Sequence, residues 1–381
     1  MLSALPDPDE NALAMSQQLV SVIRAEIEAG GGWLDFERFM ALALYSPGLG
    51  YYSGGSVKLG QEGDFVTAPE ISALFGEVIA RNLSSLLELI DRPVVLEIGA
   101  GSGKLAETIL ASLDAGGSHL SDYRILETSA DLRERQQSRL APFGDRVSWL
   151  DELPRERFEG VVLANEVLDA IPVTRFSRSD GHTCALGVGI DDSRFVWKEQ
   201  SAEAGLSAVV ESLESSLDTQ FADGYRSEIS RQIPAWISSL SDVLARGALW
   251  LVDYGLVQRE YYHPSRNDGT LICHYRHRAH ADPFFYPGLQ DISAWVDFSA
   301  CARAAEEVGL DVAGFTTQGQ FLIESGAAEM LQRDDGTVDL ARAQALKTLV
   351  LPGEMGERFK VLLLTRDIDC SLPGRDMRER L

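Results

Sequence analysis

The sequence predicts an α/β protein built on a parallel sheet that helices cover on both faces. From residue 94 onward, apolar runs of strand length alternate with helical patterns, which is typical of parallel sheets. The chain has 381 residues, above the usual size of one domain, and its hydrophobic content of 45% is ordinary for a globular protein. We therefore expect one large elaborated domain or two domains.

Three helices are expected before the sheet. Apolar residues recur at helical spacing in each of them, over Ala12–Gly30, Leu34–Leu44 and Pro69–Leu89. The intervening segment is rich in glycine and aromatic residues, lacks periodicity and is too long for a plain linker. We therefore expect Tyr51–Glu70 to form a lid over a ligand.

The sheet is expected to contain seven strands. Each is a short apolar run bounded by turn residues, and they lie at Val94–Ile98, Tyr123–Glu127, Val147–Leu150, Gly160–Asn165, Ala248–Asp253, Val312–Thr316 and Phe359–Thr365. Helices are expected after the first two strands, over Lys104–Leu113 and Ala130–Leu140.

About 80 residues separate the fourth and fifth strands, and we interpret them as an insertion. Short strands are expected at Val173–Ser177, Cys184–Ile190 and Phe195–Lys198, and helices at Ser207–Leu217 and Glu228–Leu244. This insertion is expected to cap the carboxyl edge of the sheet.

The first strand leads into a glycine-rich turn, VVLEIGAGSGKLAETIL. A phosphate-binding P-loop does not fit, because Ile98 stands where its first glycine belongs. The dinucleotide pattern G-x-G-x-x-G does not fit either, because Gly99, Gly101 and Gly103 put the third glycine one residue early. Glu97, two residues before the turn, suits a cationic ligand such as S-adenosylmethionine (SAM), which carries an ammonium and a sulfonium. A tight turn without a ligand remains the alternative.

Acidic residues end the second and third strands. Glu127 stands where α/β proteins bind the ribose hydroxyls of an adenosine ligand, although a carboxylate there could instead stabilise the start of the next helix. Asp151 could hold an adenine amino group or belong to a solvated turn.

The fourth strand ends in Asn165 and Glu166, beside the first strand at the switch point where such sheets bind ligands. A short helical turn would bring Glu166 and Asp169 to one side, where two carboxylates can hold a guanidinium. An ordinary pair of helix-capping residues explains them equally well.

Metals and several partner classes are disfavoured. His274, His277 and His280 would converge poorly on a helix, and the four cysteines form no zinc or disulfide pattern. The net charge of −24 disfavours nucleic acid and anionic membranes. No apolar run is long enough to span a bilayer, and no signal or transit peptide is recognised. We expect a cytoplasmic protein, and a homodimer is compatible with the sequence.

Successive blocks of the sequence resemble the MidA family of SAM-dependent methyltransferases. They include GDFVTAPEISALFGE, LEIGAGSGKLAETIL, LANEVLDAIPV and LVDYG, and the resemblance extends from about residue 35 to 366. Ala100 replaces the proline that often follows the first glycine in this family. The resemblance implies a class I fold, a Rossmann-like seven-stranded sheet with the last strand antiparallel.

The resemblance also implies site residues and a partner. Gly63, Asp64, Phe65 and Thr67 are expected to fold over the cofactor, with Asn165 also assigned to its binding. His277 and Asp291 are candidates for catalytic or structural roles. Mitochondrial members of the family are arginine methyltransferases that act in respiratory complex I assembly, so the implied partner is an arginine-bearing protein such as a complex I subunit.

The expected domains are therefore N-terminal helices and lid (1–90), the first part of the core (91–178), an inserted substrate region (179–246) and the second part of the core (247–381). Two other functions stay open. The chain could methylate another nitrogen or oxygen nucleophile, including one on a small molecule. It could bind SAM mainly as an assembly factor. An NAD-dependent enzyme conflicts with the glycine spacing.

Overall fold

The chain forms two compact units in the computed structural model, which describes residues 5–54, 67–333 and 335–381. The first unit combines residues 5–54 with Asp169–Gln232 and Gln258–Trp295. The second combines residues 67–168 with Ile233–Val257 and Val296–Leu381. Each unit therefore unites segments that are far apart in the sequence, whereas the four expected ranges follow one another along the chain.

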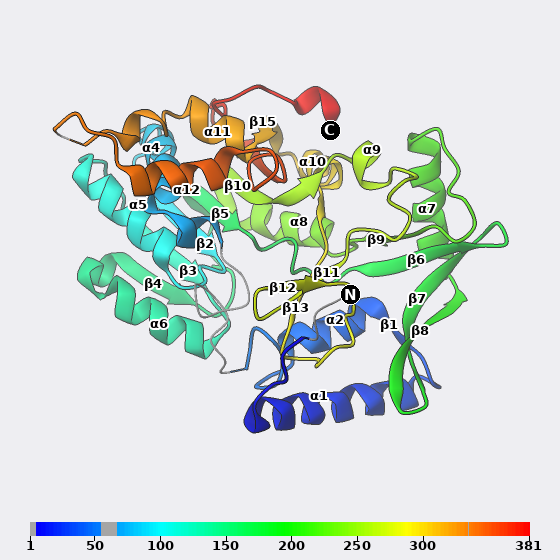
Figure 1. The fold of residues 1–381 in the computed structure, drawn as a ribbon. Coiled ribbons are helices and arrows are strands. Elements are labelled where there is room, and N and C mark those ends of the chain that lie inside the picture. The colour runs from blue at the N-terminus through cyan, green and yellow to red at the C-terminus, as the bar shows by residue number, and fades with distance from the viewer. Residues whose placement is uncertain (1–4, 55–66, 334) are drawn as a thin grey trace. The chain divides into compact units, whose positions relative to one another are not determined.

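The second unit contains the sheet. Its strands are β2 (Val94–Ile98), β3 (Asp122–Leu126), β4 (Val147–Leu150), β5 (Phe158–Asn165), β10 (Leu244–Leu256), β14 (Val296–Asp297), β15 (Asp311–Thr317) and β16 (Phe359–Arg366). They follow the spatial order β15-β16-β10-β5-β2-β3-β4, and β14 also pairs with β10. Figure 1 labels the parallel strands β10, β5, β2, β3 and β4 of this sheet. The strands from β10 to β4 are mutually parallel, whereas β16 is antiparallel to both β10 and β15. This arrangement confirms the predicted α/β sheet with an antiparallel last strand.

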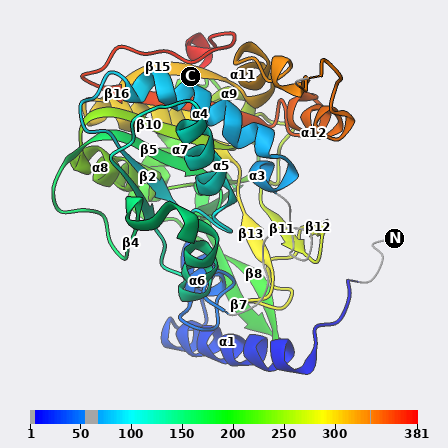
Figure 2. The ribbon, with the colours of Figure 1, turned by 90° about the vertical axis from the view of Figure 1, so that its left-hand side faces the viewer.

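Helices of the second unit cover both faces of this sheet. They are α3 (Ala68–Ile71), α4 (Ala73–Leu87), α5 (Lys104–Ala115), α6 (Ala130–Leu140), α8 (Ile233–Val243), α10 (Phe298–Glu307), α11 (Gln318–Glu324) and α12 (Leu340–Val350), with short 3-10 turns at Ala141–Arg146, Glu329–Leu331 and Arg378–Arg380. Figure 2 shows α5 and α8 on opposite sides of β5 and β10.

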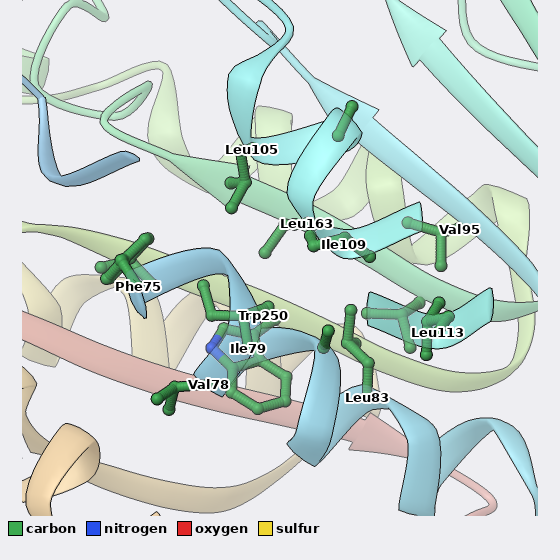
Figure 3. Close-up of a cluster of buried hydrophobic side chains, with 14 of the residues drawn as sticks. Phe75, Val78, Ile79, Leu83, Val95, Leu105, Ile109, Leu113, Leu163 and Trp250 are labelled. Carbon is green, nitrogen blue, oxygen red and sulfur yellow. The ribbon is translucent and has the colours of Figure 1, made fainter. Parts of the chain in front are cut away.

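The main core of this unit lies between the sheet and the helices α4 and α5. Figure 3 shows side chains of α4 and α5 packed with Val95, Leu163 and Trp250 from three neighbouring strands. Every one of these strand residues is buried. Because burying one large apolar side chain stabilises a fold by about 1.5–3 kcal/mol, this layer holds the strands that carry the site in place.

The first unit is built around a smaller antiparallel sheet. Its strands are β1 (Leu34–Asp35), β6 (Thr174–Ser179), β7 (His182–Asp191), β8 (Arg194–Ser201) and β9 (Arg226–Ile229), with a separate sheet of β11 (Ile272–Tyr275), β12 (Arg278–His280) and β13 (Asp291–Ser293). Its helices are α1 (Glu10–Ala29), α2 (Phe36–Tyr45), α7 (Ala204–Ser216) and α9 (Gln258–Tyr261). Apolar side chains of α1, α2 and β7 share one core with Cys273 and Ile292. Strands β6, β7 and β8 coincide with the three short strands expected in the insertion and form an antiparallel meander.

Two local predictions are wrong. The helix expected over Pro69–Leu89 is broken at Ser72, whose extended backbone ends α3 and whose hydroxyl caps α4. The helix expected from Glu228 begins only at Ile233, because Arg226–Ile229 pairs with β6. The segment containing His274 and His280, for which no element was predicted, forms the β11–β12 hairpin, in which Cys273 pairs with His280.

Candidate functional site

The carboxyl ends of five neighbouring strands bring most of the predicted site residues together. Ile98 pairs with Ala164 of β5 on one side and with Leu126 of β3 on the other. Leu126 in turn pairs with Leu150, and Asn165 pairs with Val252. The residues that follow the first four of these strands therefore form one row along the edge of the sheet with Asp253 of β10: Asp151, Glu127, Gly99, Glu166 and Asp253.

The glycine turn lies at the middle of this row, between β2 and α5. Gly99, Gly101 and Gly103 all have left-handed backbones, with φ of 64°, 54° and 77°. Glycine adopts this conformation without the steric penalty that a side chain brings. A Cβ atom at Gly99 would lie 3.4 Å from Cγ2 of Val167. The turn therefore exposes backbone that a ligand can approach closely.

Glu97 precedes the turn and points into the protein. Its carboxylate is buried and accepts a hydrogen bond of 2.7 Å from the Tyr123 hydroxyl. Burial raises the pKa of Glu97 to about 7, with the hydrogen bond from Tyr123 opposing this shift and the charge of Glu127 adding to it. Glu97 is therefore a buried acid that can be ionised or protonated near neutral pH.

Glu127 follows β3 and is also buried. One carboxylate oxygen accepts from the Ser129 amide at 2.8 Å, and the other accepts from the Gln136 side chain at 3.0 Å. Burial raises its pKa, and these hydrogen bonds oppose the shift. Because Ser129 caps helix α6, the carboxylate also interacts with the start of that helix, as the alternative interpretation expected.

Asp151 follows β4 and is largely solvated. Its side chain is 86% exposed and forms an ion pair of 2.7 Å with Arg133. Arg133 also donates to the carbonyl oxygens of Glu127 and Leu150. This cation therefore links the ends of β3 and β4.

Glu166 has an unusual backbone for a non-glycine residue. Its φ is 55°, a left-handed conformation that costs a side-chain-bearing residue about 1–2 kcal/mol. Its carboxylate accepts from the Ala68 amide and from the Asn165 side chain, both at 3.2 Å. Strain of this kind clusters at functional sites, where the surrounding structure maintains it.

Asn165 presents an unsatisfied group beside this carboxylate. Its side-chain oxygen is buried and accepts no hydrogen bond within the described parts of the chain. A buried polar atom without a partner is costly. Asn165 therefore offers a hydrogen-bond acceptor to a ligand at the switch point.

The helical turn predicted over Glu166–Asp169 is absent. Residues 165–170 contain no helix. The left-handed backbone of Glu166 interrupts a helical path, and the amides that follow it are hydrogen-bonded to Asp253. The amides of Val167 and Leu168 both donate to one carboxylate oxygen of Asp253, at 3.1 and 2.8 Å. Sequence analysis did not identify Asp253 as a site residue, although its position at the end of the predicted strand Ala248–Asp253 could have indicated a role in the site.

Asp169 is the first residue of the second chain segment of the first unit, Asp169–Gln232. Its backbone oxygen accepts from the Ala294 amide at 3.0 Å. Burial and the charges of Asp291 and Asp169 raise the pKa values of two tyrosines, Tyr45 and Tyr52. Asp169 therefore lies in a polar cluster of the first unit that the sequence analysis did not recognise.

Asp291 is the centre of that cluster. It accepts hydrogen bonds from Tyr52 at 2.9 Å and from Ser293 at 2.5 Å. The rings of Tyr45 and Tyr52 are stacked, with centroids 5.6 Å apart. The tyrosines come from positions more than 200 residues before Asp291, so only folding could bring them together.

The remaining predicted residues lie elsewhere. His277 is exposed at the tip of the β11–β12 hairpin, with φ of 60°. Thr67 precedes α3 and makes no side-chain cap to it. Gly63, Asp64, Phe65 and most of the expected lid lie outside the described residues.

Two searches of the described residues found no candidates. No group of three or more His, Cys, Asp or Glu side chains in them could hold a metal ion. Among the helices in residues 5–54, 67–333 and 335–381, none has both the length and the apolar character that crossing a membrane requires.

Comparisons with known proteins identify the family. Residues 76–316 match the profile of the family described as "Putative S-adenosyl-L-methionine-dependent methyltransferase". A Burkholderia thailandensis protein crystallised with S-adenosyl-homocysteine (SAH) is 43% identical, with a TM-score of 0.93, and the match covers 99% of this chain and 100% of that one.

Curated relatives include mitochondrial proteins named protein arginine methyltransferase NDUFAF7. The Drosophila melanogaster homolog is 27% identical over 94% of this chain and 87% of its own length. The Homo sapiens protein is also 27% identical, over 94% of this chain and 85% of its own length.

The mitochondrial location of these relatives contradicts the expected cytoplasmic location. The expectation was wrong in its reasoning as well, because an acidic composition and the lack of a spanning segment suit any aqueous compartment.

Proposed function

The chain belongs to a family of SAM-dependent methyltransferases, and we propose that it methylates an arginine side chain of a partner protein. The geometry around Glu166 is the observation that carries this proposal. An acidic side chain with a strained backbone follows β5, directly beside the glycine turn. The names of the mitochondrial relatives support arginine as the acceptor.

The residues along the sheet edge fit the cofactor. The three left-handed glycines leave backbone open to close approach, and the unsatisfied oxygen of Asn165 can accept a hydrogen bond from an ammonium. Glu127 suits ribose hydroxyls, Asp151 suits the adenine amino group, and Glu97 adds negative charge beneath the turn. Thr67, Gly63, Asp64 and Phe65 are assigned to the same cofactor by family resemblance.

When bound, SAM supplies an electrophilic methyl group, and its transfer leaves SAH. The protein's own contribution is alignment and exclusion of water. Glu166 would hold the guanidinium and aim one nitrogen at the methyl group, and a role for Asp169 in holding the guanidinium remains a prediction. Because the methylated guanidinium keeps a single positive charge, the attacking nitrogen must lose one proton, which a carboxylate can accept.

The partner is proposed to be a cationic protein surface. A net charge of −24 favours the approach of an arginine-bearing target. The family resemblance points to a respiratory complex I subunit. Catalytic roles for His277 and Asp291 and a homodimeric state remain predictions.

Substituting Glu166→Gln tests the proposal, because it keeps the shape of the side chain and removes its charge. We expect methyl transfer to fall by about 10²-fold or more while the affinity for SAH changes little. Labelled SAM and a protein extract from a strain lacking the gene would report transfer, and mass spectrometry would identify methylated arginine. Calorimetry would measure SAH binding.

Glu354→Gln is a matched control, because Glu354 is an exposed carboxylate of the same unit. It should leave both measurements unchanged. Normal turnover by the Glu166→Gln protein would remove Glu166 from the mechanism. Methylation of another residue type or of a small molecule would replace arginine as the acceptor.

A further inference from the structure

The side chain of Gln136 connects three separate parts of the candidate cofactor site. It is fully buried in helix α6. Its nitrogen donates to the backbone oxygen of Gly101 at 2.9 Å and to the Glu127 carboxylate at 3.0 Å. Its oxygen accepts from the indole nitrogen of Trp149 at 3.0 Å. The amide therefore links the glycine turn, the acid after β3 and strand β4.

Trp149 decides which way this amide points. An indole N–H can only donate, so the amide oxygen must face Trp149. The two amide hydrogens are then directed at two acceptors, Gly101 and Glu127. A flipped amide would face both acceptors with its oxygen and would place its N–H groups against the indole N–H.

The network also restricts Glu127 and the turn. With one oxygen held by Gln136 and the other by the Ser129 amide, the carboxylate has a single orientation. A Cβ atom at Gly103 would lie 3.3 Å from Cγ of Gln136. The helix therefore packs closely on the turn while its amide holds the turn's backbone.

We propose that Gln136 is a positioning residue for cofactor binding, oriented by Trp149. It holds the Glu127 carboxylate and the Gly101 backbone in the geometry that the ribose of SAM or SAH requires. This inference rests on the assignment of Glu127 to the ribose in the proposed function.

A purely structural role would give a different result from a positioning role. Loss of a structural contact lowers stability and weakens all ligands alike. Loss of a group that acts through Glu127 weakens a ligand with ribose hydroxyls and spares one without them. The ratio of affinities for SAH and its 2′,3′-dideoxy analogue therefore separates the two roles.

The test measures this ratio by calorimetry in Gln136→Met, which keeps the length of the side chain and removes its amide. We expect the Kd for SAH to rise about tenfold, as for a lost hydrogen bond to a charged group. The Kd for the dideoxy analogue should change less than about threefold. With transfer assays, KM for SAM should rise while kcat at saturating SAM stays close to that of the wild type.

Gln318→Met is the matched control, because Gln318 is another fully buried amide of the same unit and donates to the Leu349 carbonyl at 3.0 Å. It should lower stability without changing the ratio. Trp149→Phe keeps an aromatic ring and removes the indole N–H that orients the amide, and it should change the ratio in the same direction as Gln136→Met. This variant decides the question if Gln136→Met does not fold.

Two outcomes overturn the inference and are distinguishable. If Glu127→Gln weakens SAH binding but Gln136→Met and Trp149→Phe do not, positioning by Gln136 is wrong and the ribose assignment stands. If Glu127→Gln binds SAH normally, the ribose assignment itself fails. An equal loss for both ligands in Gln136→Met would show a purely structural role.

Discussion

At the scale of single residues, the site combines acids in three different environments. Glu166 is strained and held by the Ala68 amide, Glu127 is fixed by two donors, and Asp151 is solvated. A carboxylate held in one orientation can recognise a ligand with little loss of conformational entropy. The buried and fixed acids are therefore better suited to binding than Asp151.

The burial of Glu97 predicts a pH-dependent stability. Its pKa is about 7 in the folded protein and 4.5 for an ordinary glutamate. Between these values the folded state keeps a proton that the unfolded state loses, so wild-type stability falls as the pH rises from about 4.5 to 7. Glu97→Gln cannot titrate. Relative to wild type, it should gain up to about 3 kcal/mol between pH 4.5 and 7.

Urea unfolding of wild type and Glu97→Gln at pH 5 and pH 8 measures this gain. Substitution of the exposed Glu354 by Gln serves as the control. Its free energy of unfolding should differ from that of the wild type by the same small amount at both pH values. A Glu97→Gln effect that does not vary with pH would contradict the raised pKa.

At the scale of elements, strand β10 supports the chain that follows β5. Asp253 lies near the carboxyl end of this strand in a fully buried position. One of its oxygens accepts from the Val167 and Leu168 amides, and the other accepts from the Tyr254 amide. Strand β10 therefore stabilises the turn that orients Glu166.

Asp253→Asn should destabilise the protein, because its amide group would face an N–H donor where the carboxylate had an oxygen. The expected loss is about 1–3 kcal/mol in the free energy of unfolding. Methyl transfer should fall as well, because the turn carrying Glu166 loses its support. Chemical denaturation and the transfer assay measure the two effects.

Asp297→Asn is the comparison for Asp253→Asn, because it exchanges the same side chains at another buried position. Asp297 caps α10 with a single oxygen, which accepts from the Ser299 and Ala300 amides. Asparagine is an equally good cap, so this substitution should not lower the free energy of unfolding. Because burial raises the pKa of Asp297 to about 6, removing its charge should raise the stability at pH 8. Equal effects of the two substitutions would argue against the role assigned to Asp253.

At the scale of the whole molecule, charge is the dominant property. The net charge of −24 produces a field that attracts cationic proteins and is screened by salt. Once the acceptor is identified, its kcat/KM should fall about tenfold between low and moderately high NaCl. Cofactor binding at a site with internal hydrogen bonds should respond much less.

Steady-state kinetics with the protein acceptor and calorimetry with SAH, each over a series of NaCl concentrations, test this difference. A kcat/KM that does not respond to salt would exclude electrostatic attraction as a part of recognition.

The sequence by itself determined the sheet, its glycine turn and the acids after the strands. These features follow from local patterns: continuous apolar runs of strand length, helical spacing of apolar residues, and the left-handed backbone that Gly99, Gly101 and Gly103 permit. Because parallel strands end at a common edge, strand order alone also predicted that Glu127 and Glu166 flank the turn.

Only the tertiary structure decided how these side chains are held. Gln136 and Trp149 look like ordinary helix and strand residues, and their connection to Glu127 depends on the packing of α6 beside β4. The helix expected from Glu228 begins only at Ile233, because pairing of Arg226–Ile229 with β6 outweighed local propensity. Hydrogen bonds between residues far apart in sequence leave no periodic signal, so the positioning residues became visible only in the folded chain.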